Sequence, residues 1–108
     1  MSLESLEQQV IKWAKDRGIF AESTPLTRLK KMAEEFGELT DELFPPDGSE
    51  IDLERVKMES GDLLVTHINL LYPLGLDLET CLSAAYKKIK DRKGRMINGT
   101  YVKQEDLD

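Results

Sequence analysis

The sequence predicts an all-α protein, a four-helix bundle that ends in a short C-terminal β-hairpin. Two observations favour the bundle: apolar residues recur at helical spacing in four stretches, and short breaks separate these stretches. Short connections between helices of this length favour antiparallel neighbours. A third observation, a turn signal between two β-prone runs near the end, predicts the hairpin. A chain of 108 residues fits one domain, with the bundle over about 3–93 and a tail over 94–108.

The first helix is expected from Leu3 to Arg17, where Gly18 ends it. The second is expected to begin at Pro25 with Thr24 as its N-cap, and to end before the turn-rich segment 45–48. Their expected core-facing residues are Leu3, Leu6, Val10, Trp13 and Ala14 on the first, and Leu29, Met32, Ala33, Phe36, Thr40 and Leu43 on the second.

The third helix is expected to open at Ser49 or Glu50 and to end at Tyr72, which precedes a proline. Asp77 is expected to cap the fourth helix. Their expected core-facing residues are Leu53, Val56, Leu63, Leu64, His67 and Leu71 on the third, and Leu78, Cys81, Leu82, Ala85 and Ile89 on the fourth.

Asn98-Gly99 lies between two short β-prone runs, and this dipeptide is a strong local signal for a two-residue hairpin turn. An isolated hairpin is marginally stable in water. The tail is therefore expected to pack on the bundle or on another subunit.

Composition narrows the classes of partner. A net charge of −6 is expected to repel nucleic acid polymers. Neither an apolar run of the about 18 residues that a membrane span needs nor a signal-peptide pattern is evident. The single Cys81 excludes an intramolecular disulfide and fits a cytoplasmic protein. An acidic stretch over 34–62 and a basic one over 87–95 favour a small ligand that carries both a metal ion and phosphate.

Two acidic pairs, Glu35 with Glu38 and Glu59 with Asp62, stand at i, i+3 on neighbouring predicted helices. Like charges at this spacing repel each other. Each pair lies at a similar angle around its helix from the apolar face, so the two pairs are expected to converge on one groove. Mg²⁺ prefers such oxygen ligands. The alternative is that these carboxylates are simply solvated. Gly37 and Gly61, both inside the acidic motifs, are expected to allow close helix approach or ligand access.

The runs E-E-F-G-E-L at 34–39 and E-S-G-D-L-L at 59–64 resemble the paired acidic motif of the MazG-like, all-α nucleoside triphosphate pyrophosphohydrolases. The resemblance implies the bundle fold of that superfamily and Mg²⁺-dependent cleavage of an NTP or dNTP to the monophosphate and pyrophosphate, in nucleotide-pool sanitation. Mn²⁺ is a possible substitute for Mg²⁺. The implied metal ligands, which are also catalytic residues, are Glu35, Glu38, Glu59 and Asp62.

Other roles are expected from position. Glu34 is a further catalytic candidate, which would orient the attacking water or bind another ion through water. Four basic residues are candidates for phosphate binding, although cations there also complement a helix dipole. Trp13 is a candidate to stack on a base or to pack in a core or an interface, and Asn69 to reach the nucleotide. The basic candidates are Lys87, Lys90, Arg92 and Arg95.

Two other functions stay open at this stage: a dUTP- or dCTP-directed pyrophosphatase of the same superfamily, and a noncatalytic helical interaction module. Base preference depends on contacts outside the metal motif, so the sequence does not distinguish the two enzymes. Retention of all expected carboxylates argues against the module. A homodimer or homotetramer is expected from the resemblance.

Overall fold

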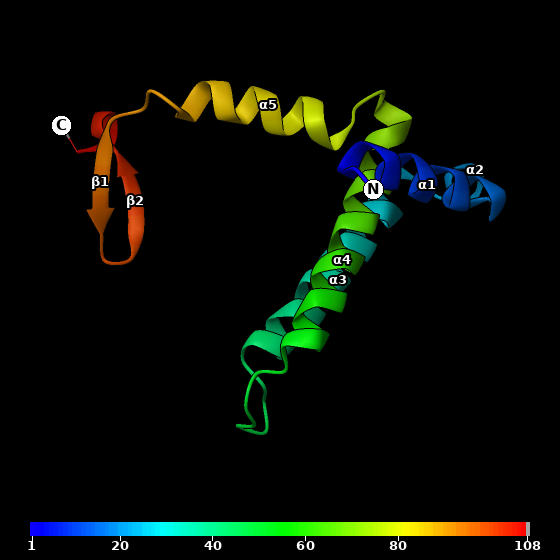
Figure 1. The fold of residues 1–108 in the computed structure, drawn as a ribbon, viewed down its shortest axis with the longest axis horizontal. Coiled ribbons are helices and arrows are strands. Elements are labelled where there is room, and N and C mark those ends of the chain that lie inside the picture. The colour runs from blue at the N-terminus through cyan, green and yellow to red at the C-terminus, as the bar shows by residue number, and fades with distance from the viewer. Residues whose placement is uncertain (108) are drawn as a thin grey trace. The chain divides into compact units, whose positions relative to one another are not determined.

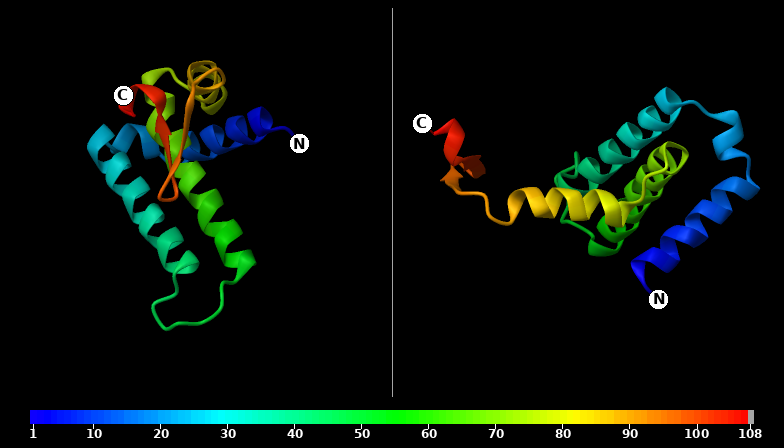
Figure 2. Two further views of the ribbon diagram at one scale, coloured as in Figure 1. Left: turned by 90° about the vertical axis from the view of Figure 1, so that its left-hand side faces the viewer. Right: turned by 90° about the horizontal axis from the view of Figure 1, so that it is seen from above.

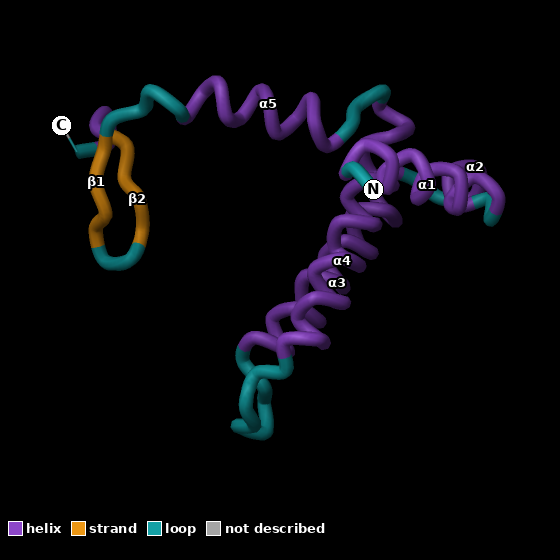
Figure 3. The backbone as a smooth tube through the Cα atoms, viewed as in Figure 1, coloured by secondary structure: helices purple, strands orange, loops and turns teal. Residues whose placement is uncertain are grey.

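The structure, a computed structural model, describes residues 1–107. It divides into two compact units, Met1–Leu78 and the segment from Glu79 onward. Helices dominate the chain and a two-stranded antiparallel hairpin lies near its end, as the sequence predicts (Figures 1 and 3). Within residues 1–107, no helix is both long enough and apolar enough to cross a membrane. A bundle of four helices and a single domain that joins the two units stay predictions.

The first unit is built around a long helical hairpin. Its elements are α1 (Leu3–Asp16), α2 (Ile19–Glu22), α3 (Pro25–Leu43), α4 (Leu53–Leu71) and the 3-10 turn η1 (Tyr72–Leu74). Helices α3 and α4 run antiparallel, side by side (Figure 2). The single turn α2 was not predicted. It follows Gly18, whose φ of +73° ends α1 in the left-handed conformation that glycine favours.

Local chemistry explains where α3 and α4 begin. Thr24 caps α3 in a reciprocal arrangement with Thr27, and Pro25 takes the first helical position, as predicted. The predicted start of the next helix at Ser49 or Glu50 is wrong by about one turn. The carboxylate of Asp52 accepts hydrogen bonds from the Glu54 and Arg55 backbone N–H groups, so α4 begins at Leu53.

The apolar core lies where α1 meets the C-terminal half of α4. Ile11 and Ala14 of α1 are buried there, together with Ile68 and Leu71 of α4. The buried carboxylate of Glu7 accepts a hydrogen bond of 3.1 Å from the Leu78 N–H. This bond attaches α1 to the end of the unit.

Two stripes of side chains run along α3, and their positions differ by one residue in the sequence. The inner stripe consists of Arg28, Met32 and Glu35, of which Arg28 and Glu35 are buried and Met32 is half-buried. The outer stripe consists of Leu29, Phe36 and Leu43, which are 51%, 63% and 38% exposed. The prediction that the outer stripe packs against the next helix is therefore wrong for the single chain.

The prediction that six residues of α4 face the core is correct in part. Leu71 is buried, and Val56, Leu63 and His67 are half-buried. Leu53 and Leu64, however, are exposed.

The second unit contains the rest of α5 (Leu78–Ile89), strands β1 (Gly94–Ile97) and β2 (Thr100–Lys103), and the 3-10 turn η2 (Gln104–Asp106). The strands pair in register from Gly94–Lys103 to Ile97–Thr100. Asn98 and Gly99 both have positive φ, 49° and 82°, as the predicted two-residue turn requires. On α5, Leu82 and Ile89 are exposed, which contradicts their predicted burial.

Candidate functional site

Three of the four predicted metal ligands meet between α3 and α4. Glu35 is buried in the contact between these helices, Glu38 follows one turn later on α3, and Glu59 lies on α4. Each offers a carboxylate oxygen, and these oxygens lie within 4.8 Å of one another. Such a set is able to hold one hard divalent cation. We call Glu35, Glu38 and Glu59 the acidic cluster.

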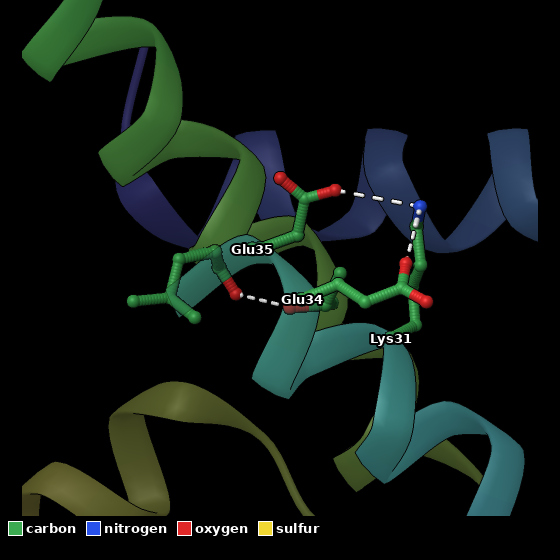
Figure 4. Close-up of polar contacts among 5 residues, drawn as sticks. Lys31, Glu34 and Glu35 are labelled. Atoms are coloured by element: carbon green, nitrogen blue, oxygen red, sulfur yellow. Dashed lines mark hydrogen bonds and ion pairs between the residues drawn. The ribbon is translucent and has the colours of Figure 1, made fainter. Parts of the chain in front are cut away.

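The other two predicted acidic residues lie beside this cluster. Asp62 is exposed and lines the same cavity as Glu35. Glu34 carries a side chain that is 64% exposed, and its Oε2 lies 3.2 Å from the Lys31 Nζ. Glu34 is therefore an exposed carboxylate that shares the Lys31 ammonium group with Glu35 (Figure 4).

Glu35 is the electrostatically unfavourable member of the cluster. Burial, and then the nearby carboxylate of Glu38 with its negative charge, raise the pKa of Glu35. Its Oε1 lies 3.6 Å from the Lys31 Nζ, whereas its Oε2 is buried without a partner (Figure 4). Glu59 also has a buried, unpartnered Oε2. A buried acceptor without a partner carries a desolvation cost of about 1–3 kcal/mol, and more when it is charged.

A cavity of about 510 Å³ opens next to Glu35 in the first unit. Residues of α1, α3 and α4 line it, among them Trp13, Arg28, Lys31, Glu35, Asp62 and Asn69. The cavity therefore combines an aromatic ring, two cations, two carboxylates and an amide. Polar groups of this kind in one concave site are typical of a small-molecule site.

Sequence reasoning missed Arg28 and Lys31. Arg28 is 8% exposed; its Nη1 donates to Ser23 O at 3.1 Å and to Ser23 Oγ at 2.8 Å, and its Nε is buried without a partner. A usable signal was present, because positions 28, 31, 35 and 38 recur at steps of three and four along one side of a helix.

The two residues expected near the nucleotide also line this cavity. Asn69 is 8% exposed, with a buried Oδ1 that has no partner. Trp13 is 43% exposed, and the Arg17 guanidinium carbon lies 4.7 Å from the centre of its ring. One face of the indole is thus in contact with a cation. Stacking of a base on Trp13 stays a prediction.

The four predicted phosphate-binding residues belong to the second unit. Lys87, Lys90 and Arg95 are exposed, and Arg92 is half-buried. The Arg92 carbonyl accepts a hydrogen bond of 3.2 Å from the Tyr101 hydroxyl, which attaches the chain before β1 to β2. Contact of these residues with phosphate stays a prediction.

The helical glycines do not have the predicted packing role in the single chain. A Cβ at Gly37 or at Gly61 would meet no atom within 4 Å. Both glycines are exposed, so close approach of α3 to α4 does not require them.

Comparison with known proteins found no matching family model, no matching curated protein and no matching solved structure. The site therefore has to be interpreted from its own residues and from the resemblance of the two acidic motifs.

Proposed function

We propose that the chain is a Mg²⁺-dependent nucleoside triphosphate pyrophosphohydrolase, which cleaves an NTP or dNTP to the monophosphate and pyrophosphate. The observation that carries the proposal is Glu35, whose buried Oε2 has no partner although two further carboxylates lie beside it. The resemblance of the motifs at 34–39 and 59–64 supplies the reaction.

The donor set fits Mg²⁺. Three carboxylates provide hard oxygen ligands, and Asp62, which lines the cavity beside Glu35, would be the fourth ligand. When bound, Mg²⁺ would neutralise the carboxylates and polarise the phosphoryl group of the substrate. The buried Glu35 oxygen would then gain the partner that it lacks.

The reaction needs a positioned water molecule. The water oxygen would bond to the α-phosphorus while the bond from that phosphorus to the α–β bridging oxygen breaks, and pyrophosphate leaves with the electron pair. Glu34 is the carboxylate proposed to orient the water and accept its proton. The described residues offer no Ser-His or Cys-His nucleophile pair at this site, so we propose direct attack without a covalent intermediate.

The cavity would hold the nucleoside. Trp13 would stack on the base. The unpartnered Arg28 Nε would donate a hydrogen bond to an acceptor on the edge of the base, and the unpartnered Asn69 Oδ1 would accept one from a donor there. Pyrimidines and purines both offer such pairs. These two atoms therefore do not distinguish the second candidate, a dUTP- or dCTP-directed enzyme, from one that accepts other bases; hydrolysis rates on separate bases would distinguish them.

A panel of NTPs and dNTPs with Mg²⁺ tests the proposal, with pyrophosphate and orthophosphate scored separately. Pyrophosphate is expected as the primary product, and Glu38→Gln and Asp62→Asn are expected to lower turnover by at least about 100-fold while the fold is retained. Glu50→Gln, which removes an exposed carboxylate from the loop before α4, is the matched control and should stay active. Orthophosphate as the primary product, or full activity of both variants, would reject the proposal.

We also propose that the chain assembles as a homodimer or homotetramer, as the resemblance of its two acidic motifs implies. The support is the outer stripe of α3, whose side chains are exposed on one face of one helix. A second copy offers the same stripe, so a two-fold axis would bury both at once. A bundle of four helices would then form from two α3–α4 hairpins.

A further inference from the structure

Among residues 1–107, the cation that contacts the acidic cluster is Lys31. Its Nζ lies 3.2 Å from Glu34 Oε2 and 3.6 Å from Glu35 Oε1 (Figure 4). It lines the same cavity as Glu35 and Asp62. The ammonium group therefore offsets part of the negative charge of the cluster when no metal ion is bound.

Lys31 and a divalent cation would compete for Glu35. An ammonium group 3.6 Å from a ligand oxygen has the same sign of charge as an ion bound to that oxygen, so each weakens the binding of the other. The Lys31 side chain is 59% exposed, and its four-carbon stem is flexible. It is therefore free to leave Glu35 without disturbing the packing of α3 on α4.

An anionic group in the cavity would give Lys31 a new partner. Because Lys31 and Glu35 both line the cavity, a short movement of the Lys31 side chain brings its ammonium group to a phosphate there. On the proposed function, on which this inference rests, that phosphate belongs to the triphosphate.

We propose that Lys31 is a phosphate-binding residue that is held by Glu34 and Glu35 until a metal ion displaces it. Lys31 then opposes binding of the free metal ion and favours binding of the metal-bound polyphosphate. Loading of the ion and binding of the substrate are thereby coupled through one side chain.

Calorimetric titration of Lys31→Met tests both parts of the proposal: that Lys31 weakens binding of the free metal ion and that it strengthens binding of the polyphosphate. First Mg²⁺ alone is titrated, and then inorganic tripolyphosphate at saturating Mg²⁺, so that no base preference enters. Lys31→Met is expected to bind Mg²⁺ about 3–10-fold more tightly and tripolyphosphate about 10-fold more weakly. Lys31→Arg should retain most of the tripolyphosphate affinity, because it keeps the charge and the donors.

Lys30→Met is the matched control, since Lys30 is the exposed neighbour on the same helix. It should change neither affinity by more than about 2-fold. Circular dichroism checks that each variant is folded.

Weaker binding of both probes to Lys31→Met, or no change in either, would overturn the inference while wild-type hydrolysis and the proposed function stand. If the wild-type chain neither binds Mg²⁺ nor releases pyrophosphate, the proposed function fails, and this inference fails with it.

Discussion

On α3, the inner stripe buries Arg28 and Glu35 to 8% exposure each, whereas the outer stripe leaves Phe36 63% exposed and Leu29 51% exposed. A helix of an isolated soluble domain usually shows the reverse, with apolar residues inside and charges outside. Burying a Phe or Leu side chain is worth about 1.5–3 kcal/mol, and a buried, unpartnered polar atom costs about 1–3 kcal/mol. Neither stripe of the single chain is therefore at its energetic optimum.

The difference indicates that the two stripes need different partners. The inner stripe has unpartnered polar atoms, Arg28 Nε and Glu35 Oε2, which a polar ligand and a cation would satisfy. The outer stripe has no polar requirement and would be satisfied by another apolar surface. On this view the inner stripe carries the proposed chemistry, and the outer stripe carries the proposed assembly.

A charge in the outer stripe is expected to have the largest effect on assembly. Phe36→Glu places a carboxylate at the centre of the stripe, where a second copy would have to desolvate it. Self-association should weaken by at least about 30-fold, the effect expected of a central interface residue. Analytical ultracentrifugation should show a dimer or tetramer for the wild type and a monomer for the variant.

The control for this experiment is Lys30→Glu, which adds negative charge on the same helix outside both stripes. This variant should assemble like the wild type. A wild-type chain that is monomeric at about 100 μM would contradict the proposed assembly and leave the outer stripe without a role.

Local signals in the sequence predicted much of the fold. Thr24-Pro25 and Asn98-Gly99 act through their own backbone and side chains, so neighbours in the sequence suffice to place the start of α3 and the hairpin turn. The choice between the two stripes of α3 is not local. They differ by about 100° of rotation, a single residue step. Apolar periodicity finds the outer stripe but does not say whether the same chain or a second copy covers it.

The candidate site was predictable to a similar extent. Spacing at i, i+3 on two helices predicted that Glu35, Glu38 and Glu59 converge, and they do. Asp62 is not part of this set of three, although it lines the same cavity as Glu35. Arg28 was missed, since its burial depends on α3 packing by the inner stripe.

The inner stripe predicts a specific pH dependence of the metal-free protein. Burial and Glu38 raise the pKa of Glu35 above its ordinary value of 4.5, so the folded state binds this proton more tightly than the unfolded state does. Between these two pKa values the folded chain holds more protons, and the free energy of unfolding therefore falls as pH rises. The contribution of the Glu35 carboxyl to the free energy of unfolding is fully present below about pH 4.5, and it is lost as pH rises through the raised pKa.

Thermal melts in a metal chelator, from neutral pH down to about pH 5, measure this effect as a difference between variants. The melting temperature of wild type relative to Glu35→Gln should rise as pH falls, because glutamine does not titrate. Glu50→Gln should follow the wild-type profile. A wild-type profile parallel to that of Glu35→Gln would mean that Glu35 has no unusual affinity for a proton.

The smallest expected effect concerns Gly37, which is adjacent to Phe36. A substitution there is expected to change both the stability of α3 and the proposed contact of the outer stripe with a second copy. A Cβ here meets no atom within 4 Å in the single chain, and alanine is about 1 kcal/mol more favourable than glycine in a helix interior. Gly37→Ala should therefore raise the free energy of unfolding by about 1 kcal/mol in the monomeric Phe36→Glu background. In the assembled wild type the gain should be smaller, because a second copy close to the outer stripe would meet the added methyl group. Urea denaturation of the four chains measures both changes, and an equal gain in the two backgrounds would place the interface away from Gly37.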